Sequence, residues 1–590
     1  MLVFLNRYFF SGRVPFLPIS IDDARGRDNA FSQFDVVFIS GDPYYDHPLS
    51  GTALLARMLE KKGYSVGIVA QPETDAEFMA CGRPKYFFCV STGLLDSMLA
   101  NYTPMLRKRE GVLVPEHGLI VYTQAIKRLF PKAFTVIGGV EATIRRCTHF
   151  DYKENALRRG VLHDTKADLL LFGNAERSLL TLLERLRAMD AHEPRFADVK
   201  EGLDLLTIDG AAFLSLSAHG AIELPSYEEC VEDKDRFALL TRIMYLLPDR
   251  AFHERCGKGA ILHNRPSHPL TEAEMDFLYD LPFERKVHPV SKQLSFVEDM
   301  VGGLVNSVII GRGCWGSCSF CIIPLVQGKH VATRSKESIL REIEALYLRG
   351  ETHINDLTLP TLNMYGSRCD LYDAPETIRS LLIDADVVVY NKRLGCNQQC
   401  VGCPHRKISD DLIPLLEGVR ALQHKYAGTT LELRSALRHD IVLSQKALFR
   451  EVMRFVSRLK IAPEHISDNV LAQMRKADRA AFDEFLKEFE RVNEEQGTKK
   501  RLVPYFVAGH PGSTMEDMRI LKEYCTEHGI FVNLTQVFTP TPGTLSTAMY
   551  YSGKNPLSGK LVHIPRTFRE KKDQKNALLA GDEDIVDDNG

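Results

Sequence analysis

Three cysteines stand close together in the sequence RGCWGSCSFCIIP at residues 312–324. Thiolates as close in sequence as Cys314, Cys318 and Cys321 can bind different metal ions of one cluster, and cysteine is the usual ligand of iron–sulfur clusters. Three ligands leave one iron of a four-iron cluster without a protein partner, so a small molecule can coordinate there. The motif therefore predicts an iron–sulfur cluster with one open iron.

Two other interpretations of this motif are less consistent with its three cysteines. A structural zinc ion needs four ligands and usually pairs two cysteine knuckles, which three cysteines do not supply. Unrelated buried cysteines are a second alternative, but three within eight residues is far above background.

A second set of cysteines repeats the same spacing at Cys396, Cys400 and Cys403, with Cys369 upstream. Four cysteines can complete a closed second cluster or a zinc site, and a set without metal is the third alternative. The first set is favoured as the open cluster because it follows a predicted strand and has the aromatic Phe320 before its last cysteine. The second set has Gly402 at that place.

The elements that must position these cysteines read as strands and helices in alternation over residues 296–545. A series of β/α units of this length predicts a complete or partial barrel. Its expected strands are residues 307–311, 386–390, 430–433, 458–462, 502–507 and 531–537.

Residues 1–190 predict a different α/β unit, a doubly wound parallel sheet. Its short apolar runs are separated by helical patterns, which is typical of buried parallel strands. Ligands of such sheets bind outside the carboxyl ends of the strands. We therefore expect one crevice at the residues that follow the strands, namely Asp46, His47, Ser91, Thr92, Gly138, Gly139 and Glu141.

Residues 191–295 are less regular and are interpreted as a connecting segment, and residues 546–590 as a carboxyl-terminal extension whose acidic end is disordered. The net charge of −3 argues against a nucleic-acid partner. There is no apolar stretch of membrane-spanning length and no signal peptide pattern, so a cytoplasmic location without membrane association is expected.

Many ordered motifs resemble the YgiQ-type (UPF0313-like) family of radical S-adenosylmethionine proteins. Besides the first cysteine motif, they include GGVEATIRR (138–146), PTLNMY (360–365), LKIAPEH (459–465), VPYFVAGHPGS (503–513) and TPTPGTLSTAMYYSGKNPL (539–557). The resemblance spans nearly the whole chain. It departs just before PTLNMY, where the family usually has glycines and this chain has Leu357, Thr358 and Leu359.

The resemblance implies a [4Fe–4S] cluster whose open iron is chelated by S-adenosylmethionine. Reduction of the cluster would then yield methionine and a 5′-deoxyadenosyl radical that acts on an unknown substrate. An electron donor such as flavodoxin or ferredoxin is implied as a partner. The candidate cofactor-binding residues, for each of which a structural role is the alternative, are Thr361, Asn363, Arg434, Ser435 and Glu464.

The amino-terminal unit is also similar to the cobalamin-binding domains of some radical enzymes. It either holds cobalamin or is a similar sheet without it, and the adjacent Asp46 and His47 differ from the Asp-x-His of histidine-ligating modules. Two other functions fit the sequence less well. A tRNA methylthiotransferase would carry a small β-barrel after Pro540, where none is evident, and a non-catalytic iron–sulfur or zinc protein has little use for an open iron.

Overall fold

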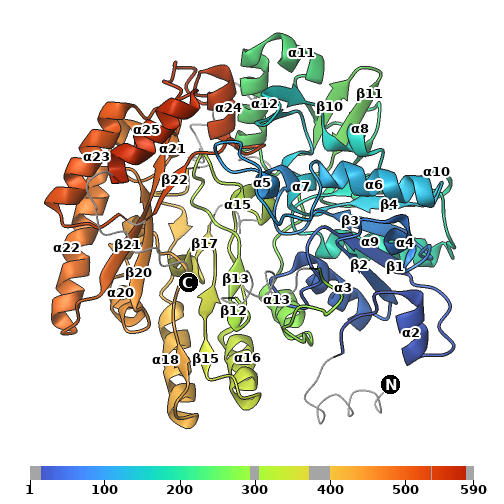
Figure 1. The fold of residues 1–590 in the computed structure, drawn as a ribbon, viewed down its shortest axis with the longest axis horizontal. Coiled ribbons are helices and arrows are strands. Elements are labelled where there is room, and N and C mark those ends of the chain that lie inside the picture. The colour runs from blue at the N-terminus through green and yellow to red at the C-terminus, as the bar shows by residue number, and fades with distance from the viewer. Residues whose placement is uncertain (1–14, 293–303, 371–398, 533, 580–590) are drawn as a thin grey trace.

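The computed structural model describes residues 15–292, 304–370, 399–532 and 534–579 of the 590-residue chain. Two α/β units lie side by side (Figure 1): an amino-terminal unit on one large sheet, and a second unit on shorter parallel strands. The fold class predicted from the sequence is confirmed. The predicted strand at 386–390, Cys396 and the acidic carboxyl end lie outside the described residues.

Five parallel strands form the first part of the amino-terminal sheet. Their apolar runs are buried because helices cover both faces. In one strand, Val36 and Phe38 pack against α3 (Gly51–Lys61) and α9 (Glu176–Ala188), while Val37 and Ile39 pack against α6 (Gly118–Leu129). This is the predicted doubly wound arrangement, with the strand order β2 (Val66–Ala70), β1 (Val36–Ser40), β3 (Phe87–Ser91), β4 (Thr135–Ile137) and β7 (Leu169–Leu171).

The sheet continues past residue 190, the boundary predicted from the sequence. Four more strands, drawn from the supposed connecting segment, extend it beyond β7 in the order β8 (Ala211–Leu214), β11 (Gly259–His263), β10 (Phe252–Cys256) and β9 (Ile222–Glu223). β8 runs antiparallel to β7, and β10 and β11 form an antiparallel pair. Polar residues in β10 and β9 interrupt the apolar pattern on which the prediction relied.

Helices and a hairpin complete this unit. They are α2 (Ile21–Arg27), α4 (Asp75–Met79), α5 (Ser97–Asn101), α7 (Gly139–Ile144), β5 (His149–Asp151) paired with β6 (Ala156–Arg158), α8 (Val161–Thr165), α10 (Phe196–Val199), α11 (Tyr227–Glu232), α12 (Lys234–Leu246) and α13 (Glu272–Tyr279).

The second unit is a partial barrel of parallel strands. Within the described residues, β12 pairs with β16 and β15 pairs with β19. β21 pairs with β20 on one side and with β22 on the other. A parallel bridge between Leu437 and Ile461 joins the segment after β19 to β20. The strands are β12 (Ser307–Ile309), β15 (His353–Ile354), β16 (Asp356–Thr358), β19 (Thr430–Leu431), β20 (Arg458–Glu464), β21 (Arg501–Ala508) and β22 (Leu534–Val537).

Amphipathic helices follow these strands and bury one core with them. Helix starts are fixed locally, as at α23, where Thr514 and Asp517 form a reciprocal capping box. The helices are α16 (Lys336–Leu348), α18 (Leu412–Lys425), α19 (His439–Val442), α20 (Lys446–Met453), α21 (Asp468–Met474), α22 (Arg479–Glu495) and α23 (Met515–Glu527), followed by α24 (Leu545–Ser552) and α25 (Phe568–Leu579).

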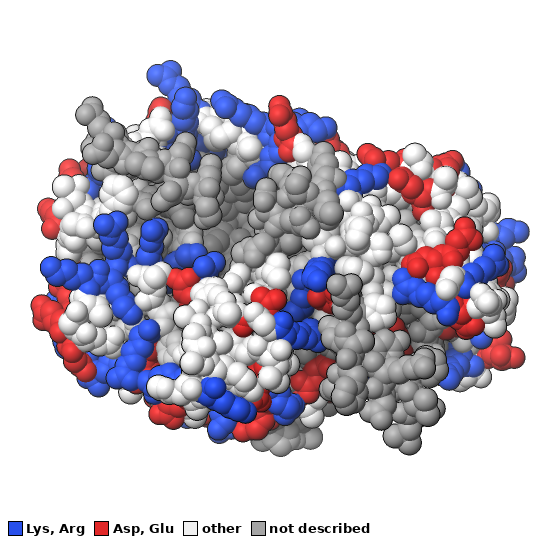
Figure 2. All heavy atoms as spheres, turned by 60° about the horizontal axis from the view of Figure 1, so that its bottom comes forward, with Lys and Arg blue, Asp and Glu red and all other residues white. Residues whose placement is uncertain are grey.

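The surface carries charges of both signs. Figure 2 shows Lys and Arg interspersed with Asp and Glu over one face of the molecule. None of the helices in the described residues has the length and apolar character needed to cross a membrane.

Candidate functional site

The first candidate site is the loop of residues 313–322, here called the cysteine loop. It follows β12 and β13 (Gly311–Arg312) at the carboxyl end of the first barrel strand, where barrel enzymes place their active sites. The chain returns through β14 (Ala332–Thr333), which pairs with β13. Gly313 has a φ of +89°, and a Cβ there would lie 2.0 Å from the carbonyl oxygen of His330. Only glycine fits this position, so the sequence before Cys314 fixes how the loop begins.

The three sulfur atoms of the cysteine loop fit a cluster better than a single ion. Tetrahedral zinc holds thiolate sulfurs about 3.8 Å apart, because each Zn–S bond is about 2.3 Å. Among the described residues, Cys314, Cys318 and Cys321 do not form a group whose sulfurs all lie within 4.8 Å of one another. Cluster ligands bind different irons and need no such approach. The donor set therefore suits an iron–sulfur cluster.

The surroundings of the sulfurs combine burial with one cation. Burial raises the pKa of the Cys314 thiol, the neighbouring Cys318 adds to this, and the pKa of Cys321 is also raised mainly by burial. The guanidinium Nη1 of Arg438 donates to Cys318 Sγ at 3.6 Å. A buried cation at this distance stabilises thiolates and any negatively charged cluster they hold.

Arg438 was not among the residues predicted from the sequence, and it is held tightly. The side chain of Asn363 accepts a hydrogen bond from the backbone N–H of Arg438 at 3.0 Å and donates one to the backbone carbonyl of Arg438 at 3.1 Å. Asp440 forms an ion pair with the guanidinium at 2.9 Å. Burial lowers the pKa of Arg438, but Asp440 and Cys318 more than offset this and raise it overall. The guanidinium is therefore fixed and charged beside the sulfur.

Of the five predicted cofactor-binding residues, Thr361 lies next to a cysteine and Glu464 acts on one electrostatically. Thr361 Oγ1 is 3.6 Å from Cys314 Sγ. Glu464 contributes to the raised pKa of Cys321 and forms an ion pair with the buried Lys476 at 3.7 Å. Glu464 also has a φ of +69° at an irregularity in β20, a strained backbone of the kind found at functional sites.

The structure gives the other three predicted residues partners away from the sulfurs. Asn363 holds the backbone of Arg438, as described above. Ser435 donates to Asp356 at 2.6 Å and so ties two strand ends together. Arg434 is exposed and pairs with Glu432 at 2.8 Å.

The second cysteine set lies against the cysteine loop. Cys369 is on β17 (Arg368–Cys369), which pairs with β18 (Arg406–Lys407), and the N–H of Cys403 donates to the carbonyl of Cys400. The guanidinium of Arg406 lies 4.5 Å from the centre of the Trp315 ring, and Trp315 directly follows Cys314. Cys396 lies outside the described residues.

Replacing Cys396, Cys400 and Cys403 together by alanine should lower the iron or zinc content without eliminating 5′-deoxyadenosine formation. The reason is that the first set carries the aromatic residue, the strand context and the neighbouring Arg438. Metal analysis and product chromatography on the folded variant test this. Complete loss of S-adenosylmethionine cleavage would mean that the two sets are coupled or exchanged in role.

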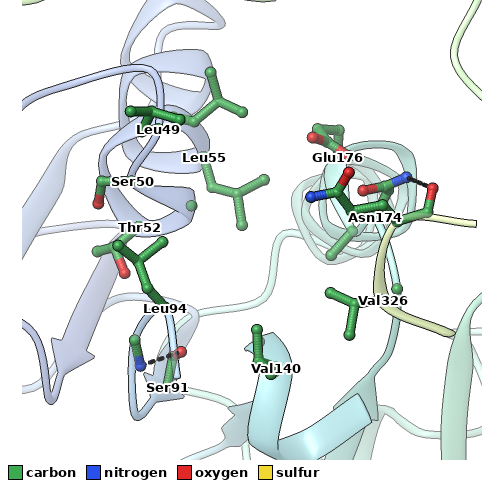
Figure 3. A pocket seen from close by; sticks show the side chains of 18 of the residues that line it. Leu49, Ser50, Thr52, Leu55, Ser91, Leu94, Val140, Asn174, Glu176 and Val326 are labelled. Carbon is green, nitrogen blue, oxygen red and sulfur yellow. Dashed lines mark hydrogen bonds between the residues drawn. The ribbon is translucent and has the colours of Figure 1, made fainter. Parts of the chain in front are cut away.

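A cavity of about 430 Å³ separates the carboxyl edge of the amino-terminal sheet from the barrel. Figure 3 shows Leu49, Ser50, Thr52 and Leu55 on one side of it. Asn174 and Glu176, at the start of α9, lie on the other side with Val326, and Val140 lies at the base. Further lining residues are Asp42, Ser91, Gly93, Gly138, Gly139, Gly311, Arg312 and Thr358 to Pro360.

The cavity adjoins the cysteine loop through hydrogen bonds between the two units. Asn174 donates to the carbonyl of Gln327 at 3.1 Å, and Gln327 Oε1 accepts from the N–H of Gly313 at 3.1 Å. Arg312, the residue before Gly313, forms a buried ion pair with Glu176. The edge of the amino-terminal sheet is thus connected directly to the start of the cysteine loop.

Some residues expected in the crevice do not line this cavity. Asp46 is fully buried and paired with Arg57 at 2.5 Å. His47 Nε2 lies 3.0 Å from the carbonyl oxygen of Val305, and Nδ1 accepts from the N–H of Leu49. Thr92 and Glu141 are likewise buried away from the cavity lining. Ser91, Gly138 and Gly139 do line it.

The sequence matches a family described as Radical SAM N-terminal over residues 16–298, and a domain of unknown function, DUF3362, over residues 533–584. Among solved structures, the cobalamin-dependent radical enzyme OxsB matches 84% of this chain and 52% of its own at 11% identity and a TM-score of 0.45. The radical S-adenosylmethionine methyltransferase TsrM from Kitasatospora setae, solved with cobalamin and a [4Fe–4S] cluster, matches 87% of this chain and 77% of its own at 14% identity and a TM-score of 0.49.

Curated relatives match over nearly the whole chain. A UPF0313 protein of Geobacter sulfurreducens is 38% identical over 96% of this chain and 92% of its own. A UPF0313 protein of Thermotoga maritima is 35% identical over 96% of this chain and 98% of its own. A UPF0313 protein of Methanocaldococcus jannaschii is 34% identical over 94% of this chain and 90% of its own. With these relatives and the Radical SAM N-terminal match, the chain belongs to the UPF0313 family of radical S-adenosylmethionine proteins.

Proposed function

We propose that this enzyme cleaves S-adenosylmethionine reductively at a [4Fe–4S] cluster held by Cys314, Cys318 and Cys321. The observation that carries the proposal is the cysteine loop itself, with three half-buried cysteines at a barrel strand end and a fixed cation beside Cys318. When bound, the cluster supplies the electron that splits the cosubstrate into methionine and a 5′-deoxyadenosyl radical, which takes a hydrogen atom from the substrate.

The residues around the loop have distinct parts in this proposal. Arg438 offsets the negative charge of the thiolates, and Asn363 and Asp440 position it. Thr361 and Glu464 are our candidates for binding the amino and carboxyl groups of S-adenosylmethionine, because Thr361 lies 3.6 Å from Cys314 Sγ and the charge of Glu464 acts on Cys321. Lys476, paired with Glu464, supplies a second cation for the cosubstrate carboxylate.

We assign the substrate to the cavity between the units. Its volume of about 430 Å³ lies within the roughly 300–1,000 Å³ typical of small-ligand sites. The lining is mainly apolar, with a few polar groups such as Asn174 and Ser50 that could fix orientation. The hydrogen bonds through Gln327 keep this space beside the cysteine loop, as a short-lived radical requires.

Cobalamin is a second candidate occupant of the cavity, favoured by the glycines that line the sheet edge. His47 is a poor cobalt ligand, because contacts to the protein backbone occupy both of its ring nitrogens. We therefore expect that titration with hydroxocobalamin does not produce the visible absorption spectrum of histidine-ligated cobalt. A histidine-type spectrum that disappears in His47→Gln would contradict this, and absence of binding leaves the cavity to the substrate.

Anaerobic reconstitution of the full chain tests the proposed function. Protein reconstituted with iron and sulfide should bind at least four irons per chain, as one four-iron cluster requires. With dithionite in place of a flavodoxin or ferredoxin, it should form 5′-deoxyadenosine slowly from S-adenosylmethionine. A chain that binds zinc at the cysteine loop and forms no 5′-deoxyadenosine would support the non-catalytic alternative.

A further inference from the structure

Three buried side chains that bind metals elsewhere meet in the amino-terminal unit, apart from both cysteine sets. Cys147 Sγ, His263 and a carboxylate oxygen of Glu254 all offer ligand atoms within 4.8 Å of one another. The residues are 3%, 1% and 3% exposed. This is the one group of its kind among the residues that the structure describes. Cysteine sulfur, histidine nitrogen and carboxylate oxygen are all ligands that zinc accepts in proteins.

The sheet register brings two of these residues together. In the antiparallel pair of β10 and β11, Phe252 is opposite His263, and Glu254 lies two residues along the same strand. Side chains two apart share a face, as do those of opposed residues, so Glu254 and His263 project from the same side of the sheet. Cys147 reaches them from the segment between α7 and β5.

The spacing agrees with a tetrahedral ion. Cys147 Sγ and His263 Nε2 are 3.6 Å apart. Bond lengths of about 2.3 Å to sulfur and about 2.05 Å to nitrogen place these two atoms about 3.6 Å apart around tetrahedral zinc. His263 Nδ1 has no hydrogen-bond partner among the described residues, although it is buried. A hydrogen bond at Nδ1 therefore does not compete with a metal ion for the orientation of this ring.

A second buried thiol and a cation lie near these three donors. A fully buried second thiol, Cys230, lies close enough to add to the raised pKa of Cys147. With Arg146 as a nearby cation, two thiolates and one carboxylate would balance a divalent ion. A tetrahedral ion takes a fourth ligand, and Cys230, which is outside this group, would have to move toward the other three residues to supply it.

We propose that Cys147, Glu254 and His263 bind a structural zinc ion. The ion would tie the antiparallel extension of the sheet to the segment before β5. The ion would be buried in the core of the fold, so its effect should be on stability and metal content.

The test measures zinc and iron per chain in the full-length protein after anaerobic reconstitution and dialysis against zinc. The variants are Cys147→Ala and His263→Gln, with Cys89→Ala as a matched control, because Cys89 is buried in β3 of the same sheet. The double variant Cys400→Ala/Cys403→Ala controls for zinc in the second cysteine set. Circular dichroism verifies folding. Each of the first two variants is expected to lose one equivalent of zinc and to keep its iron.

The two controls should keep that zinc. Unchanged zinc in Cys147→Ala and His263→Gln, or a wild-type chain without it, would overturn the proposal. Zinc that disappears only with Cys400 and Cys403 would do the same. If neither site variant folds, X-ray absorption at the zinc edge of the wild-type protein decides the matter. A mixed sulfur, nitrogen and oxygen shell is expected, and an all-sulfur shell would contradict the assignment.

Discussion

Replacement of Cys318 by alanine is expected to abolish 5′-deoxyadenosine formation and to remove most of the iron bound at the cysteine loop. Cys318 is the central cysteine of the three and the one that receives the hydrogen bond from Arg438. A [4Fe–4S] cluster with only two protein ligands left is expected to be lost. Without it the reductant has no route to the cosubstrate, so the expected loss of activity is complete.

The measurement is product formation by the reconstituted variant, together with iron and sulfide content. Cys525→Ala is the matched control, because Cys525 is a buried cysteine of α23 in the same barrel and packs only in the apolar core. That variant should keep its iron and its activity. Cleavage of S-adenosylmethionine by folded Cys318→Ala protein would refute the assignment of the cluster to this loop.

The cysteine loop could be predicted from the sequence because its information is local. Ligand spacing, the glycine at 313 and the preceding strand all lie within fifteen residues. The first five strands of the amino-terminal sheet were predictable for a similar reason. They are continuous apolar runs, which helices on both faces bury.

The antiparallel extension of the sheet was missed because its strands bury polar side chains. β10 contains His253 and Glu254, which read as surface residues in the sequence. In the fold, His253 contacts Glu223, and Glu254 accepts a hydrogen bond from the N–H of Thr148, more than a hundred residues earlier. Partners so distant in sequence leave no periodic signal.

Distant partners also decided which basic residue reaches the cysteines. The sequence indicated Arg434 at a strand end, whereas Arg438, four residues later, lies beside Cys318. The selection is made by Asn363, which holds the backbone of Arg438 from another strand end 75 residues away. Similarly, the sequence indicated Asp46 as a residue of the ligand crevice. In the fold it is buried and forms an ion pair with Arg57 of the following helix.

Replacing Arg438 by methionine is expected to slow S-adenosylmethionine cleavage by between about tenfold and a hundredfold. Reduction adds a negative charge next to this cation. Unit charges about 5 Å apart interact by roughly 3 kcal/mol at an effective dielectric constant of about 20, and each 1.4 kcal/mol of activation energy is a factor of about ten. The same energy corresponds to a decrease of the order of 100 mV in the one-electron reduction potential.

The design must separate this effect from simple destabilisation. Loss of Arg438 leaves Asp440 buried without its partner, which is costly, so the double variant Arg438→Met/Asp440→Asn is measured beside the single one. Arg434→Met is the matched control, because that guanidinium is exposed and pairs with Glu432. Arg438→Lys keeps the charge and should restore part of the rate.

A redox titration followed by electron paramagnetic resonance gives the readout that a purely structural role would not move. Both methionine variants at 438 should bind as much iron as the wild-type chain and show the lower potential, while Arg434→Met should match the wild type. Equal potentials in all variants, with slow cleavage only where folding is impaired, would show that Arg438 supports the fold and does not tune the cluster. The lysine variant decides between charge and shape, because Lys restores the charge of Arg but cannot reproduce its forked contact with Asp440.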